Sequence, residues 1–429
     1  MIRDQVLDNQ IEWHMNEIEK HLDQCFDNIN NFIDQVFFID SSISKSSNPK
    51  FELTLPKIHQ FQLIHQSDFQ SRILQQLKPL INSKIKDECQ FQQQQQQHQQ
   101  SLIIQQQQSN LKPFTYQIIK EHSIKQSEFC LAIAFNKDSS IVATGCNEQI
   151  KIYEFKQGML KLIQVLNQHN QYVNTLNFMK KSNQIISGDQ SGSILIWSSN
   201  NNTQWNCSQT IKGHINWVNC LILNYNEDIF ISSSQDKTIK FWIKQNEWIC
   251  QQTITDHTSY VYQISLNEQQ NKLISCGADK KILVIEYSEQ SQKWIVIQKI
   301  NVECYGIRIC FINNNLFTFQ PIQGNLMHVY EMNSVSKQFL KTKDIDVNQG
   351  QEGYTLFPQQ FIKQKQLLVN KHDKYVNFIR ITQKDQFKLE QSIQFGHNLL
   401  FGQLSDDGQY FITWDRSNNE IQIRTYIEQ

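Results

Sequence analysis

A repeated pattern of short strand-forming runs governs the sequence from about residue 113 onward. Three consecutive stretches show it best, and they begin at His169, His214 and His257, which lie 45 and 43 residues apart. In each, the histidine is followed by an aromatic–valine pair, an apolar run ending in serine, and a last apolar run after a turn. A unit of this length forms a small sheet that cannot cover its own apolar faces. The repeat therefore predicts sheets that pack on one another.

Each of the three stretches also carries polar and aromatic residues at matching offsets. The sets are His214, Ser232, Asp236 and Trp242; His257, Ser275 and Asp279; and His169, Ser187 and Trp197. These stretches resemble the WD40 repeat, whose marks are a Gly-His dipeptide, three strands, a turn aspartate and a closing Trp-Asp. The resemblance implies a hydrogen-bonded network inside each unit. The second set ends at Ile285 instead of Trp, and in the third Ser191 stands where the aspartate is expected. We interpret the sets as structural, since they recur whereas a catalytic triad normally occurs once.

Four further units follow the same period with weaker signatures. They run from His122 to Tyr153, Tyr305 to Tyr330, Tyr354 to Ile379 and His397 to Arg424. The count of seven resembles the commonest WD40 ring. The resemblance implies an all-β seven-bladed WD40 propeller over residues 113–429.

Closure of such a ring is also predicted. Each unit is preceded by an outer strand, as at residues 205–211, 248–254 and 294–300, where a tryptophan begins the strand. After Arg424 only five residues remain, too few for another outer strand. Residues 114–120, FTYQIIK, have the form of an outer strand with no unit before them. We expect this segment to complete the last blade and leave no unpaired edge between the last blade and the first.

The N-terminal third differs in character. In residues 1–40, apolar residues from Met15 to Val36 are spaced alternately 3 and 4 apart, which predicts an α-helical coiled coil. A single amphipathic helix packed on the rest of the chain fits as well. Nine acids against two bases would make a homodimer of this helix repel itself. Residues 41–112 are predicted to be a linker with one short helix and a tract from Phe91 to Gln108, of which 12 residues are Gln, acting as a tether.

One position is aromatic in six of the seven units, just before the first inner strand. The residues are Phe129, Tyr172, Trp217, Tyr260, Tyr305 and Tyr354. In the WD40 family this position lies near the rim of the top face, so the resemblance implies a protein-binding surface. Aromatic side chains with a polar tip are frequent at binding hot spots. Packing of each ring on the next blade explains the pattern equally well. The turn lysines Lys237, Lys280 and Lys281 fit an acidic or phosphorylated peptide, although solvated lysines explain them more simply.

Composition excludes several classes of function. The chain has 40 Lys and Arg against 41 Asp and Glu, so no basic field points to nucleic acid. No apolar run reaches the length of a membrane span. No cysteine pair has metal-ligand spacing, so we expect reduced thiols, a cytoplasmic location and no bound metal. No phosphate-binding loop, dinucleotide fingerprint or nucleophile motif occurs, so we expect no cofactor and no catalytic residues.

These observations favour a non-enzymatic scaffold that presents the top face of the propeller to a partner protein. Residues 1–40 would supply a second contact, by self-association or by a coiled coil with another chain. Two alternatives remain. The motif from Asn246 to Cys250 is similar to repeats of the WD40 adaptor for cytosolic iron–sulfur cluster assembly. A coiled coil before a recognition domain would also fit a substrate receptor in ubiquitin transfer, although no zinc-binding module accompanies it.

Overall fold

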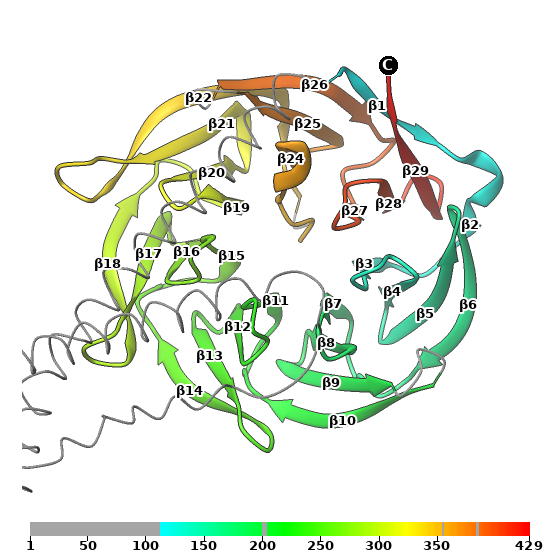
Figure 1. The fold of residues 1–429 in the computed structure, drawn as a ribbon, viewed down its shortest axis with the longest axis horizontal. Helices are drawn as coiled ribbons and strands as arrows, with labels where there is room; N and C mark the ends of the chain where they lie inside the picture. The colour runs from blue at the N-terminus through cyan, green and yellow to red at the C-terminus, as the bar shows by residue number, and fades with distance from the viewer. Residues whose placement is uncertain (1–111, 200–203, 354–355, 383–385) are drawn as a thin grey trace, which may run out of the picture. The chain divides into compact units, whose positions relative to one another are not determined.

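The computed structural model describes residues 112–199, 204–353, 356–382 and 386–429. Within these ranges the chain forms seven antiparallel sheets arranged as the blades of a ring (Figure 1). The predicted all-β seven-bladed propeller is thus confirmed. The helix predicted in residues 1–40, and the short helix and glutamine tract predicted in residues 41–112, lie outside the described residues except for Lys112.

Blades are numbered in chain order, and the strands of each blade are given from the ring centre outward. Blade 1 contains β3 (Cys130–Phe135), β4 (Ile141–Cys146), β5 (Gln149–Lys156) and β6 (Met159–Leu166), and blade 2 contains β7 (Val173–Met179), β8 (Gln184–Asp189), β9 (Ser193–Ser199) and β10 (Trp205–Lys212). Blade 3 contains β11 (Val218–Leu223), β12 (Ile229–Ser234), β13 (Ile239–Lys244) and β14 (Trp248–Ile254), and blade 4 contains β15 (Val261–Leu266), β16 (Lys272–Gly277), β17 (Lys281–Ser288) and β18 (Lys293–Asn301).

The last three blades follow the same order. Blade 5 contains β19 (Gly306–Asn313), β20 (Leu316–Pro321), β21 (Gln323–Met332) and β22 (Phe339–Gln351), and blade 6 contains β23 (Gln360–Ile362), β24 (Leu367–His372), β25 (Tyr375–Thr382) and β26 (Gln386–Gln394). Blade 7 contains β27 (Leu400–Leu404), β28 (Tyr410–Asp415), β29 (Glu420–Glu428) and β1 (Phe114–Ile118). The short strand β2 (Ile124–Lys125) pairs with β29, and two 3-10 turns lie at η1 (Lys120–His122) and η2 (Lys363–Lys365).

Burial explains why the strands differ in sequence. Middle strands lie between two neighbouring blades and are apolar or small on both faces, as in β4, where all six residues are buried. Outer strands alternate between exposed and covered side chains, as in β18. The tryptophans that begin β10 and β14, and Trp294 in β18, are buried and cover the gaps between blades.

Blade 7 is completed by the strand farthest from it in the chain. β1 pairs antiparallel with β29, from Phe114 opposite Glu428 to Ile118 opposite Arg424, and the two lie side by side in Figure 1. Phe114 and Tyr116 are each 3% exposed, and the Tyr116 hydroxyl donates to the backbone oxygen of Gly408 at 2.6 Å. The ring is therefore closed by pairing between the two ends of the described chain.

Glutamine side chains join the outer strands of neighbouring blades. In each case Oε1 accepts from a backbone N–H at 2.7–2.9 Å, and Nε2 donates to the carbonyl oxygen of the same residue at 2.6–3.3 Å. The pairs are Gln164 with Trp205, Gln209 with Trp248, Gln252 with Trp294, Gln298 with Phe339, and Gln391 with Tyr116. We call these contacts glutamine clasps. Each carboxamide supplies the donor and acceptor that a strand would supply, because its geometry matches that of a peptide group.

The clasps should contribute measurably to stability. Replacing Gln252 with Met keeps the side-chain length but removes both hydrogen bonds to Trp294, so we expect the free energy of unfolding to fall by about 1–3 kcal/mol. Urea denaturation would measure this loss. The neighbouring Gln251 is exposed on the same strand, so Gln251→Met serves as the control and should change stability by less than about 0.5 kcal/mol. Equal losses in both variants would show that the clasp adds nothing.

Blades 5 and 6 are held together differently. Among the residues that the structure describes, no glutamine clasp joins β22 to β26. Instead, Glu352 lies between Arg308 of β19 and Lys371 of β24, and all three side chains have 0% exposure. Arg308 Nη1 donates to Glu352 Oε2 at 2.9 Å, and Lys371 Nζ donates to Oε1. Burial lowers the pKa of Lys371 to about 8, although Glu352 favours the charged form. We call these three residues the buried ion triad.

Candidate functional site

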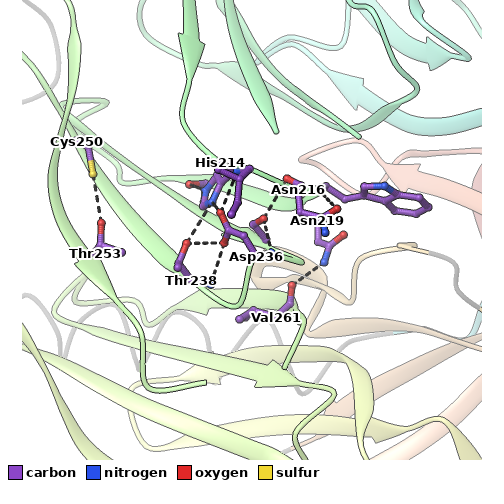
Figure 2. Close-up of polar contacts among 12 residues, drawn as sticks. His214, Asn216, Asn219, Asp236, Thr238, Cys250, Thr253 and Val261 are labelled. Carbon is purple, nitrogen blue, oxygen red and sulfur yellow. Dashed lines mark hydrogen bonds and ion pairs between the residues drawn. The ribbon is translucent and has the colours of Figure 1, made fainter. Parts of the chain in front are cut away.

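The best-formed polar network lies in blade 3 and runs from the sheet to the turn. Figure 2 shows its turn end, with His214, Asp236 and Thr238. Trp242 Nε1 donates to Ser232 Oγ at 2.8 Å. Ser232 Oγ lies 2.7 Å from His214 Nε2, and His214 Nδ1 lies 2.7 Å from Asp236 Oδ2. Since the carboxylate only accepts, Nδ1 carries the proton, and the serine hydroxyl therefore donates to Nε2. Burial raises the pKa of Asp236, but hydrogen bonds from His214 and Thr238 outweigh it and hold that pKa well below its usual range.

The neighbouring networks differ from the sequence interpretation in one respect. In blade 2, His169 Nε2 lies 2.7 Å from Ser187 Oγ, which also accepts from Trp197 Nε1. His169 also has a carboxylate partner, although Ser191 occupies the position where the repeat places an aspartate. Asp189, the last residue of β8, places Oδ2 2.8 Å from His169 Nδ1. The carboxylate that reaches His169 thus comes from two residues earlier in the chain than the expected position, which Ser191 does occupy.

In blade 4 the histidine contacts its serine and its aspartate, but no tryptophan donates to the serine. His257 contacts Ser275 Oγ at 2.8 Å and both oxygens of Asp279 at 3.0 Å. Its set ends in the buried Ile285, which has no N–H on its side chain to donate. The side chains of all three network histidines are at most 1% exposed, which leaves a substrate no access. Their geometry fits the structural role predicted from their recurrence.

A neutral buried histidine makes stability depend on pH. Burial lowers the pKa of His214 and outweighs the raising effect of Asp236. At pH values below about 6.5 the unfolded chain therefore binds a proton that the folded chain does not, and stability decreases as the pH falls. Asp236 acts in the same direction at lower pH, since its stabilising effect is lost as the pH falls through its folded value. Urea midpoints measured from about pH 7.5 to 5.5 should fall, and His214→Gln should flatten the slope. An unchanged slope in His214→Gln would exclude this histidine as the source.

A cavity of about 240 Å³ opens where the inner strands begin, at the mouth of the ring. Its floor receives one residue from the inner region of every blade: Leu131, Asn174, Asn219, Tyr262, Ile307, Leu356 and Phe401. Its wall is formed by Phe129, Tyr172, Trp217 and Leu399, which come from blades 7 and 1 to 3. In six blades the floor residue is the second residue of the inner strand, whereas Leu356 of blade 6 precedes β23. We call this cavity the mouth.

The structure brings together three of the six aromatic residues predicted to form the binding surface. Phe129, Tyr172 and Trp217 line the mouth, and the rings of the first two lie 6.5 Å apart. Tyr260 is 41% exposed but does not line the mouth. Tyr305 stacks on Tyr262 at 6.1 Å, in keeping with the packing alternative. Tyr354 lies outside the described residues, so a complete aromatic ring is not observed.

The floor residues and the amide of Gln190 were not predicted. Gln190 and Gln235 line the mouth from the turns between the second and third strands of blades 2 and 3. The signal was present in the period, because floor residues stand two positions after each aromatic, at spacings such as 43 and 45. The repeat is hard to recognise because Leu, Asn, Tyr and Ile alternate at those positions. These side chains occupy equivalent positions in the blades but differ in polarity.

Within the described ranges, no helix is long and apolar enough to cross a membrane. No three His, Cys, Asp or Glu side chains in those ranges are grouped closely enough to hold a metal ion.

Comparison with known proteins finds similarity in three segments of the chain. The model of the "WD domain, G-beta repeat" family matches residues 160–198, 205–242 and 248–286. A segment of 108 residues, 24% of this chain, is 28% identical to one third of the THO complex subunit 6 homolog of Danio rerio. A segment of 43 residues, 10% of the chain, is 46% identical to 9% of the nuclear distribution protein PAC1 of Candida dubliniensis. The matches thus span one third or less of either relative. The resemblance to the iron–sulfur adaptor gains no support from them. The described part of the chain is a seven-bladed β-propeller, and three of its segments are similar to the WD domain, G-beta repeat.

Proposed function

We propose that the chain is a non-enzymatic scaffold that docks a partner protein on the mouth of its propeller. The observation that carries this proposal is an apolar cavity adjoining large exposed apolar side chains. Ile215 is 92% exposed and Trp217, in the wall of the mouth, is 36% exposed. Apolar side chains left exposed beside a concave surface are typical of protein-binding sites.

The chemistry of the lining supports binding over catalysis. No carboxylate, imidazole, amine or thiol is among the described residues that line the mouth. General acid–base and nucleophilic catalysis depend mainly on such groups. The residues that do resemble catalytic groups, such as His214 and Ser232, are buried in the blade networks.

The other parts of the chain complete the proposal. Residues 1–40 would form the second contact, and residues 41–112 a tether that lets the two contacts move independently of the propeller in residues 113–429. One matched relative is by its name a subunit of a complex, which is in keeping with a role in assembly. We place the protein in the cytoplasm on its cysteine pattern, with other proteins as partners and with neither nucleic acid nor membrane among them.

Substitution of the exposed aromatics tests the docking surface. The variant Trp217→Ala with Tyr260→Ala should weaken partner binding at least 30-fold, because a hot-spot aromatic contributes about 2 kcal/mol or more. Affinity purification from the native source identifies the partner, and titration with the purified partner measures the affinity. Tyr225, 66% exposed beyond the first strand of blade 3, provides the control Tyr225→Ala, which should bind normally. Unchanged affinity in the double variant, with an unchanged melting temperature, would contradict the proposal.

A further inference from the structure

Exposed lysines beside the mouth indicate the charge of the segment that docks there. Exposed apolar and basic side chains share the turns of blades 3 and 4 on the side of the mouth, and we call this surface the lysine rim: Ile215, Trp217, Lys237, Tyr260 and Lys280. We propose that the lysine rim binds an acidic segment of a partner protein, which places an apolar residue in the mouth. This inference rests on the proposed docking function and adds the chemistry of the partner.

Each lysine of the rim lies close to the aromatic residue of its own blade. The backbone oxygen of Trp217 accepts at 2.9 Å from the N–H of the residue two places before Lys237. The backbone oxygen of Tyr260 accepts at 2.8 Å from the N–H of the residue two places before Lys280. Both aromatic side chains are partly exposed, and both lysines are exposed. Two adjacent blades therefore repeat the same combination of an aromatic ring and a cation.

This combination is confined to blades 3 and 4 among the described rim aromatics. The lysine follows its aromatic by 20 residues in both blades. At the same offset, a glutamine, a glycine and an asparagine follow Phe129, Tyr172 and Tyr305. The glycine, Gly192, has φ +88°, and Lys237 and Lys280 have φ +73° and +59°. A side chain is unfavourable in this left-handed region, and glycine completes the turn in blade 2 without one. The lysine side chains are therefore not needed to form the turn.

The carboxylates beside these lysines do not neutralise them at the surface. Asp236 and Asp279 have side chains only 4% and 2% exposed, and each accepts a hydrogen bond from the network histidine of its blade. The half-buried Asp256, on the turn before blade 4, pairs with Lys299 at 2.7 Å. No described carboxylate forms an ion pair with either lysine of the rim. An approaching segment thus meets two exposed cations, which attract acidic residues and repel basic ones.

The mouth accounts for the apolar part of the ligand. Trp217 belongs both to the lysine rim and to the wall of the mouth, and Ile215 is 92% exposed beside it in the chain. The described lining of the mouth carries no charge, so an acidic side chain inserted there would lose its hydration without gaining a counter-charge. Acidic residues therefore stay outside, near the lysines, while an apolar neighbour such as Leu or Phe enters the mouth.

A displayed random dodecapeptide library tests this specificity on the full-length chain. Clones are retained on the immobilised protein, and those whose binding is lost with Trp217→Ala are sequenced. We expect the selected peptides to carry several Asp or Glu residues around one apolar residue. In a synthetic peptide, replacing the acids with Asn and Gln should weaken binding tenfold or more, measured by calorimetry. Binding of the acidic peptide should also weaken as the salt concentration rises, because salt screens exposed charges.

A charge reversal tests the same contact from the side of the protein. The variant Lys237→Glu with Lys280→Glu should weaken the selected peptide tenfold or more, because attraction becomes repulsion. The variant Lys293→Glu with Lys337→Glu is the matched control and should bind normally. Both control lysines are exposed where the third strand turns into the fourth, at the opposite end of the strands. The peptide-side substitution needs no protein variant, so a folding defect in the charge reversal does not affect it.

The outcomes separate this inference from the proposed function. Peptides that depend on Trp217 but bind equally well after neutralisation of their acids overturn the acidic-segment inference alone. A phosphoserine that binds at least tenfold tighter than the acid it replaces would instead assign the lysine rim to phosphorylated segments. Failure to recover any peptide that depends on Trp217 counts against the docking function, and the inference falls with it.

Discussion

A chain lacking residues 1–122 will lose its cooperative thermal transition, whereas a chain lacking residues 1–110 will melt like the full-length protein. The longer deletion removes β1 and with it the buried rings of Phe114 and Tyr116. Loss of a buried aromatic side chain costs about 3–5 kcal/mol, so the two together approach the whole stability of an ordinary domain. It also leaves the outer edge of β29 unpaired.

Circular dichroism melts of the two truncations provide the comparison. The shorter deletion is the matched control, because it keeps Lys112, whose backbone oxygen accepts from Arg380, and Pro113, whose backbone oxygen accepts from Gln429. Equal melting temperatures for the two truncations would mean that β1 is dispensable for closure.

Glu352→Gln will destabilise the protein by about 3–5 kcal/mol, because it removes the negative charge between two buried cations. Arg308 and Lys371, whose side chains have 0% exposure, would then lack the carboxylate that binds both of them. The loss relative to the native chain should be partly recovered as the pH rises toward about 8, because without Glu352 the folded Lys371 releases its proton below that pH and no longer repels Arg308, while the unfolded lysine still binds a proton. Chemical denaturation at two pH values measures both effects.

Lys371→Met is the matched control for this charge argument. This substitution alters the same contact between blades 5 and 6 but leaves Arg308 and Glu352 as an ion pair of opposite charges at 2.9 Å. Its cost should be clearly smaller than that of Glu352→Gln. If Lys371→Met destabilises the protein as much or more, packing rather than charge compensation holds blades 5 and 6 together.

The glutamine clasps give the composition of the chain a structural meaning. The protein contains many more glutamines than a typical globular protein, and at first sight this dilutes its apolar signature. Five of them instead bind backbone groups of the next blade, and each clasp follows an apolar residue four positions earlier on its strand, such as Trp205 before Gln209. The spacing was visible in the sequence, but nothing in a linear pattern shows that the amide crosses to a neighbouring sheet.

The candidate site was predictable in position and not in composition. Aromatic residues at one repeated offset indicated the rim, and three of them line the mouth. The offset does not show which rings turn toward the opening, since Tyr305 stacks on Tyr262 instead. Asp189 was missed for a related reason, because a carboxylate two residues from its expected place still reaches His169. Side chains are flexible enough to fill one spatial role from neighbouring positions.

The sequence by itself determined the class of fold, the number of blades and the need for a closing strand. These properties follow from the period of apolar residues, which depends on local strand geometry and on the length of each unit. The tertiary structure decided which side-chain amides lack hydrogen-bond partners and how the charges of Arg308 and Lys371 are balanced between blades 5 and 6. It also decided which backbone groups the glutamine clasps bind. Those features join residues roughly 20 to 50 positions apart, or far more where β1 meets blade 6, so they exist only once the blades are packed.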